Sequence, residues 1–169
     1  MTNTVLLPPT IIDVATPIIF LAGPIQGADD WQTRAIKIIN DINPRITIAS
    51  PRRQALNETF VWEDQVDWET HYLRAAGKSG VILFWLAKET HHDCSRPFAL
   101  TSRFEIAEWK MRHERDNARL VIGVDSEFVG ARYIKHRFSQ DCPDVPICDS
   151  LEETCKKAVE VISLRHDAE

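Results

Sequence analysis

The sequence lacks the features that would place the protein in a membrane or send it out of the cell. It has no apolar run approaching the roughly 20 residues that a membrane-spanning helix needs, so we expect no membrane association. Its first residues, MTNTVLLPPTIIDVATP, lack the basic segment, apolar core and small-residue cleavage site of a secretory signal. A cytoplasmic location is the expectation that follows.

Paired cysteines and an excess of basic residues are also missing. The four cysteines include no CxxC pair, so reduced thiols are expected. The run His91, His92, Asp93 and Cys94 lies in one expected loop without a second pair of ligands, which favours a polar loop over a metal site. The net charge is −5, whereas nucleic-acid binders usually need a basic face that displaces counterions. We therefore expect neither a metal nor a nucleic-acid partner.

The composition that remains is that of a soluble globular protein. The chain has 169 residues, of which 44% are hydrophobic and 27% charged. This length suits one domain, and we find no internal repeat, low-complexity tract or linker. The expectation is a single domain over residues 1–169, with residues 1–16 as an extended N-terminal arm.

Short apolar runs alternate with helical patterns along the chain. Strands are predicted at 18–22, 46–49, 81–85, 120–124 and 145–148, and helices at 31–42, 62–76, 101–117 and 151–164. This alternation predicts an α/β fold, a Rossmann-like or flavodoxin-like three-layer sandwich with a mostly parallel sheet of about five strands. Ligands bind at the carboxyl ends of the strands in such sheets, so the chemistry should follow Ala22, Ala49, Trp85 and Val124.

The loop after the first of these strands contains Gly23, Pro24 and Ile25. A glycine there lets the backbone approach a ligand closely, but the GxGxxG fingerprint is absent, which disfavours classical dinucleotide binding. The alternative is an ordinary tight turn in which Asp29 or Asp30 caps the next helix.

The loop after the second strand carries two guanidinium groups, those of Arg52 and Arg53. Bidentate hydrogen bonds from these groups suit a phosphate or a carboxylate. The alternative is that one arginine forms a structural ion pair with an acid from a neighbouring helix.

Acidic side chains mark the two helices that should border the crevice. Residues 62–69 combine two tryptophans with four acids, among them Trp68 and Glu69, which suits a planar base beside a carboxylate. The alternative is a solvated acidic first turn that favours the helix dipole, with the tryptophans in the core. In the later helix, Ser102 and Glu105 have the spacing of a capping box. The same position would also direct the Glu105 carboxylate into the crevice as a nucleophile.

Taken together, these segments resemble the nucleoside 2-deoxyribosyltransferase-like family. The resemblance rests on FLAGPI at 20–25 with Trp31 following, SPRR at 50–53, QVDWE at 65–69, ILFW at 82–85 and FEIAEW at 104–109. The segments run in the family's order over residues 18–125.

The resemblance implies a Rossmann-like fold and a glycosyl-transfer chemistry. Glu105 matches the nucleophile that attacks C1′ of a 2′-deoxynucleoside, and Glu69 falls near the acid that assists substrate binding and base protonation. Gly23, Pro24 and Ile25 would form one wall of the site. Trp68 or Trp85 would stack on the base. No metal or organic cofactor is implied.

Departures from the family's pattern keep other functions open. The Gly-rich run before the catalytic glutamate is replaced by RPFALTSR at 96–103. Related nucleotide N-glycosidases pass the sugar to water, and the twin arginines leave a 5′-phosphorylated substrate open. A third interpretation is a nucleotide-binding module without turnover. The family implies small-molecule partners, a nucleoside or nucleotide and a free base, and a homodimer or larger homo-oligomer, in which residues 128–138 would form a contact surface or a lid.

Overall fold

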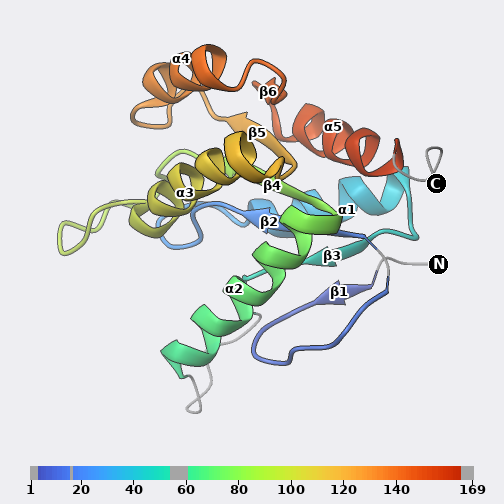
Figure 1. Ribbon diagram of the computed structural model, residues 1–169. Helices are drawn as coiled ribbons and strands as arrows, with labels where there is room; N and C mark the ends of the chain where they lie inside the picture. The colour runs from blue at the N-terminus through green and yellow to red at the C-terminus, as the bar shows by residue number, and fades with distance from the viewer. Residues whose placement is uncertain (1–3, 16, 54–60, 165–169) are drawn as a thin grey trace.

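The computed structural model describes residues 4–15, 17–53 and 61–164, and its strands and helices alternate along the chain (Figure 1). The strands are β1 (Val5–Leu6), β2 (Ile18–Ala22), β3 (Thr47–Ala49), β4 (Val81–Leu86), β5 (Leu120–Val124) and β6 (Ile147–Cys148). The helices are α1 (Trp31–Ile42), α2 (Trp62–Ser79), α3 (Leu100–Asp116), α4 (Ala131–Asp141) and α5 (Leu151–Ser163).

One open sheet contains these strands in the order β1-β3-β2-β4-β5-β6, and every neighbouring pair is parallel. Without the edge strand β1, this is the 2-1-3-4-5 order of flavodoxin-like domains. The predicted α/β sandwich is therefore confirmed, with six strands in place of about five.

The additional strand comes from the expected N-terminal arm. Leu6 of β1 aligns with Ala49 of β3, and the Ile48 N–H donates to the Thr4 carbonyl at 2.9 Å. A two-residue strand shows no alternation of its own, because its existence depends on the edge of β3 that it covers. Val5 and Leu6 of the predicted arm thus form the edge of the sheet rather than part of a separate extension.

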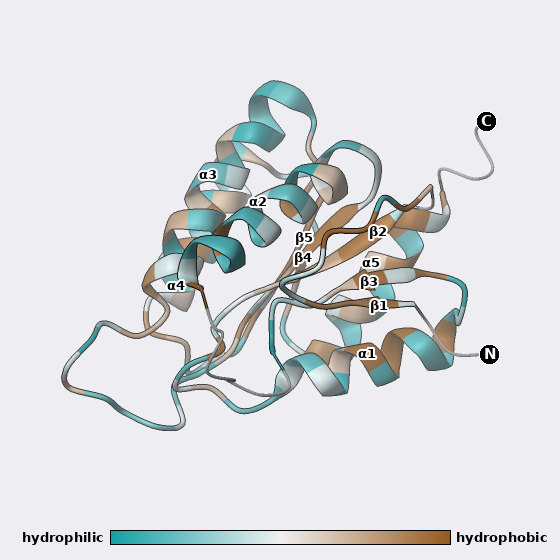
Figure 2. Cartoon of the chain, turned by 90° about the horizontal axis from the view of Figure 1, so that it is seen from below, coloured by the Kyte–Doolittle hydropathy of each residue, from teal (hydrophilic) through white to brown (hydrophobic). Residues whose placement is uncertain are grey.

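Helices cover both faces of the sheet, α1 and α5 on one side and α2, α3 and α4 on the other (Figures 1 and 2). Alternate residues of each strand feed the two cores. Ile19 and Leu21 of β2 pack toward α1 and α5, whereas Ile18, Phe20 and Ala22 pack toward α2 and its neighbours. Burial on both faces explains why β2, β4 and β5 are continuous apolar runs.

Helix α4 was not predicted from the sequence. Its residues are mostly polar, and it buries Ala131 and Phe138 against the core that α2 and α3 cover. Gly130 precedes it with a φ of 94°, a conformation that glycine adopts without strain. So narrow an apolar stripe gives little periodic signal, which is why the helix was missed.

The topology creates a crevice between β2 and β4. From β2 the chain crosses through α1 to β3 on one side, and from β4 it crosses through α3 to β5 on the other. Parallel sheets bind ligands at the point where the connections from two neighbouring strands lead in opposite directions.

None of the helices in the described part of the chain combines the length and apolarity that spanning a membrane requires.

Candidate active site

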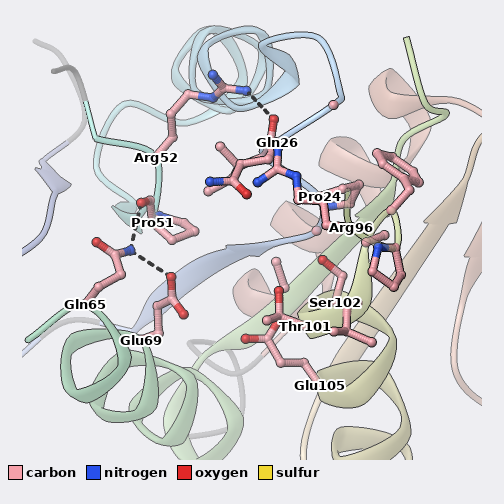
Figure 3. A pocket seen from close by; sticks show the side chains of 18 of the residues that line it. Pro24, Gln26, Pro51, Arg52, Gln65, Glu69, Arg96, Thr101, Ser102 and Glu105 are labelled. Carbon is pink, nitrogen blue, oxygen red and sulfur yellow. Dashed lines mark hydrogen bonds between the residues drawn. The ribbon is translucent and has the colours of Figure 1, made fainter. Parts of the chain in front are cut away.

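A cavity of about 570 Å³ lies in this crevice, at the carboxyl ends of β2, β3 and β4 (Figure 3). Its walls come from the loops after these three strands, the first turns of α2 and the first turns of α3. The volume is within the usual range for a small-molecule site. Of the predicted site residues, those that line it are Gly23, Pro24, Ile25, Arg52, Arg53, Glu69, Ser102 and Glu105.

Glu105 lies on the second turn of α3 and lines the cavity. The helix begins at Leu100, preceded by Ala99 in the left-handed conformation with a φ of 56° and no side-chain cap. Ser102 is therefore inside the helix, and the capping-box alternative is wrong, because the helix starts earlier than the predicted boundary. Within the described residues, the Glu105 carboxyl has no hydrogen-bond partner.

The surroundings of Glu105 favour its neutral form. Burial raises the pKa of its carboxyl to about 8, with smaller contributions from the nearby charges of Glu69 and Glu108. An acid whose pKa is displaced this far, and which faces a cavity, is typical of a functional site. This carboxyl therefore holds its proton at pH 7.

Glu69 faces the same cavity from α2, across from Glu105 (Figure 3). Gln65 donates to its carboxylate through Nε2 at 2.7 Å and to the Pro51 carbonyl at 3.0 Å. The Arg53 Nε in turn donates to the Gln65 Oε1 at 2.7 Å. Burial raises the pKa of Glu69, while the Gln65 hydrogen bond and the Arg53 charge oppose that rise. The network fixes this acid on the wall that faces the nucleophile candidate.

Arg52 holds the loops of the cavity together. Its Nε donates to the Gln32 Oε1 at 2.9 Å and lies 3.2 Å from the Asp30 carboxylate. Asp30 also caps α1 by accepting from the Thr33 N–H at 3.1 Å. The predicted alternative, an ion pair with a helix acid, is thus what Arg52 forms.

The backbone after β2 forms one wall of the cavity. Gly23 has a φ of 148°, and a Cβ at this position would overlap the Trp85 carbonyl oxygen and come within 2.9 Å of the Trp31 ring. The Trp31 indole N–H donates to the Pro24 carbonyl at 2.8 Å. The turn therefore depends on glycine at this position.

We expect Gly23→Ala to lower the free energy of unfolding by about 3 kcal/mol, since it adds both a clash and backbone strain. Urea unfolding measures the change. Gly130→Ala is the matched control, because Gly130 also has a positive φ but its Cβ would meet only the Arg103 side chain, at 3.5 Å. Equal losses in the two variants would contradict the clash and leave strain alone as the cause.

The two predicted stacking residues, Trp68 and Trp85, are not among the residues that line the cavity. Trp68 is fully buried, packs at 6.1 Å from Phe20 between ring centroids, and donates its indole N–H to the Thr10 carbonyl at 3.1 Å. Trp85 belongs to the core beneath α1 and α5. Both rings face a core because they lie on the apolar sides of α2 and β4, so the structure does not support a base-stacking role for either.

Sequence reasoning missed the part of the wall that comes from the loop after β4. Arg96, Phe98 and Thr101 line the cavity, as does Trp62 at the start of α2, whose side chain is 64% exposed. Only the position of this loop, after the carboxyl end of the central strand, could have indicated these residues.

Residues 128–138, predicted as a contact surface or a lid, do not line the cavity. Phe128 lies in the core, so the lid alternative is wrong.

The loop that raised the metal alternative is polar and largely exposed. His92 pairs with Glu89 at 2.9 Å, and Asp93 accepts from the Ser95 hydroxyl at 2.7 Å. Across residues 4–15, 17–53 and 61–164, no group of three or more His, Cys, Asp or Glu is arranged to hold a metal ion. All four cysteines are free thiols.

Comparison with known proteins identifies the family. No curated protein matches the chain significantly. The family described as "nucleoside 2-deoxyribosyltransferase like" matches residues 16–127, more than half of the 169-residue chain. This range includes all the residues that line the cavity, from Phe20 to Glu105. The chain therefore belongs to the nucleoside 2-deoxyribosyltransferase-like family.

Proposed function

We propose that this protein cleaves the N-glycosidic bond of a nucleoside or nucleotide, with Glu105 as nucleophile, and transfers the pentosyl group to another base. The observation that carries this proposal is the Glu105 carboxyl itself. It faces a cavity of about 570 Å³, has no hydrogen-bond partner within the described residues, and lies across from a second acid. A carboxylate used only for structure would be paired or solvated.

The reaction proceeds in two displacements. A Glu105 carboxylate oxygen attacks C1′, the C1′–N bond breaks, and its electron pair passes to the departing base, which takes a proton from Glu69. A nitrogen of the incoming base then attacks C1′, returns a proton to Glu69 and releases the Glu105 carboxylate. Two inversions give net retention at C1′. The ionised carboxylate also stabilises the oxocarbenium-like transition states.

The two acids act as one titrating unit. The Glu69 charge raises the pKa of Glu105, so we expect the pair to keep one proton over a range of pH. The reactive form has the proton on Glu69 and the negative charge on Glu105. The Gln65 hydrogen bond fixes the position of the proton donor.

The proposed function is tested by incubating the protein with a deoxynucleoside and a different free base, across several pairs, and separating the products by chromatography. The exchanged nucleoside is the expected product. Base release without an acceptor would instead assign the N-glycosidase activity, in which water accepts the sugar. Ligand-induced thermal stabilisation with no turnover would contradict both activities and favour a binding module.

We expect Glu69→Gln to lower kcat about 10²-fold, because the departing base loses its proton donor. The substitution also removes a negative charge near Glu105. The pKa of Glu105 should fall, and the acidic limb of the pH–rate profile should move to lower pH. Asp67→Asn, at an exposed position of the same helix, is the matched control. An unchanged pH profile in Glu69→Gln would contradict the coupling of the two acids.

Two expectations from the sequence stay predictions. One is a homodimer or larger assembly, for which exposed apolar side chains of α3 and α4, such as Phe104 and Tyr133, offer a surface. The other is a cytoplasmic location.

A further inference from the structure

The Ser102 hydroxyl is a buried polar group without a use in the mechanism above. The residue is 2% exposed and lines the cavity, and Figure 3 shows its hydroxyl directed into that space. Within the described residues the hydroxyl has no hydrogen-bond partner. Because the hydroxyl opens onto the cavity, a ligand bound there can supply the hydrogen bond that the protein does not.

The first residues of α3 also line the cavity. Leu100, Thr101 and Ser102 are the first three residues of the helix, all three line the cavity, and no side chain caps the helix end. The amides of a first helical turn have no partners within their helix. Together with the helix dipole, they make this end a favourable place for an anion.

Arg96 adds a full positive charge to the wall of the cavity. Its side chain lines the cavity, and Figure 3 shows it beside Gln26 and Pro24, above Ser102 in the view. The Nε of Arg96 lies 3.4 Å from the Asp93 carboxylate, and within the described residues its two terminal nitrogens have no hydrogen-bond partner. A guanidinium with terminal N–H groups available suits a phosphate oxygen.

The twin arginines that first suggested a phosphate are less suited to it. Arg52 is held by Gln32 and Asp30, and Arg53 donates to Gln65. Both therefore serve the loop and the Glu69 wall. Among the described residues, the Ser102 hydroxyl and the terminal nitrogens of Arg96 line the cavity without such an internal hydrogen bond.

Spacing along α3 relates this end to the proposed nucleophile. Ser102 and Glu105 are three residues apart, on one face of the helix and about 4.5 Å apart along its axis. A pentose with its C1′ at Glu105 places its 5′ substituent a comparable distance away along the helix. Resting on the proposed function, we propose that the Ser102 hydroxyl, the first amides of α3 and Arg96 bind the 5′-phosphate of the substrate, which is a nucleoside 5′-monophosphate.

The test compares each of the four deoxynucleoside 5′-monophosphates with the corresponding deoxynucleoside. We expect kcat/KM to favour the preferred monophosphate about 100-fold, as two or more charge-assisted hydrogen bonds provide. Ser102→Ala and Arg96→Ala should each reduce this ratio about 10-fold. Arg45→Ala, which removes an exposed arginine outside the cavity, is the control and should leave the ratio unchanged.

Calorimetric binding to the Glu105→Gln protein separates this proposal from the proposed function. The ligands are the monophosphate, the nucleoside, 2-deoxyribose 5-phosphate and inorganic phosphate. Binding of the phosphate esters that is tighter than that of the nucleoside, and that is lost in Ser102→Ala, supports the subsite. If no turnover occurs in the wild type, this result stands and only the proposed function fails. Turnover with equal preference for nucleoside and monophosphate overturns the subsite and leaves the proposed function standing. A preference that falls in Arg52→Ala but not in Ser102→Ala or Arg96→Ala also overturns the assignment, and so does the absence of any phosphate-dependent binding.

Discussion

Replacing Glu105 with glutamine should lower kcat about 10⁴-fold while leaving the fold and the binding of substrate intact. The amide keeps the shape of the side chain but is a very weak nucleophile, so no glycosyl ester forms. Residual turnover would come from positioning alone. Base exchange measured by chromatography, with circular dichroism and calorimetric binding in parallel, checks the prediction.

Glu108→Gln is the matched control for this loss. Glu108 lies on the same helix one turn later, pairs with Arg112 at 2.7 Å and does not line the cavity. Its replacement should change kcat less than about threefold, because a surface ion pair contributes little. Comparable losses in the two variants, or full activity in Glu105→Gln, would exclude Glu105 as the nucleophile.

The Glu105→Gln substitution should also stabilise the protein above about pH 5, and the gain should increase as the pH rises. The unfolded chain releases the Glu105 proton near the ordinary pKa of 4.5, whereas the folded protein keeps it up to about pH 8. Between these values the folded state binds one more proton, so the wild-type free energy of unfolding falls by about 1.4 kcal/mol per pH unit. Glutamine has no proton to lose and avoids this cost.

At about pH 8.5 we expect Glu105→Gln to be more stable than the wild type by about 2 to 4 kcal/mol, or about 5 to 15 °C in Tm. At about pH 4.5 the two proteins should melt together. Differential scanning calorimetry across this range measures the divergence, with Asp67→Asn, at an exposed position of α2, as the control. A constant difference at every pH would show that the Glu105 carboxyl titrates normally and is not withdrawn from water. The wild-type protein is then less stable because it keeps an ionisable group in its active site, as is common for functional residues.

The central sheet could be predicted because its strands are buried on both faces. The run Ile18–Ala22 is apolar throughout and ends at Gly23, and the structure starts and ends β2 at the same residues. Helix α1 was equally clear, since its apolar spacing and its Asp30 cap agree. Edges gave less signal, because β1 depends on the edge of β3 that it covers, and α4 carries a narrow apolar stripe.

The candidate site was predictable where chemistry and position coincide. Glu105 and Glu69 are acids on helices that follow strands of the sheet, and the structure brings both to one cavity. The roles of aromatic residues were harder to predict. A tryptophan beside an acid gives the same sequence pattern whether its ring faces a ligand or a core. Trp68 faces the core, whereas Trp62 six residues earlier lines the cavity. The rotation of α2 decides between them, and it is set by packing on the sheet.

Trapping the glycosyl enzyme tests the central claim most directly. A 2′-fluorinated deoxynucleoside slows both displacements, because fluorine destabilises the positive charge that develops at the sugar in each transition state. After incubation without an acceptor base, digestion and mass spectrometry should find the fluorinated pentosyl group on the peptide that contains Glu105, and adding a free base should remove it. Release of base with no adduct, or an adduct on another residue, would contradict the assignment of Glu105 as the nucleophile.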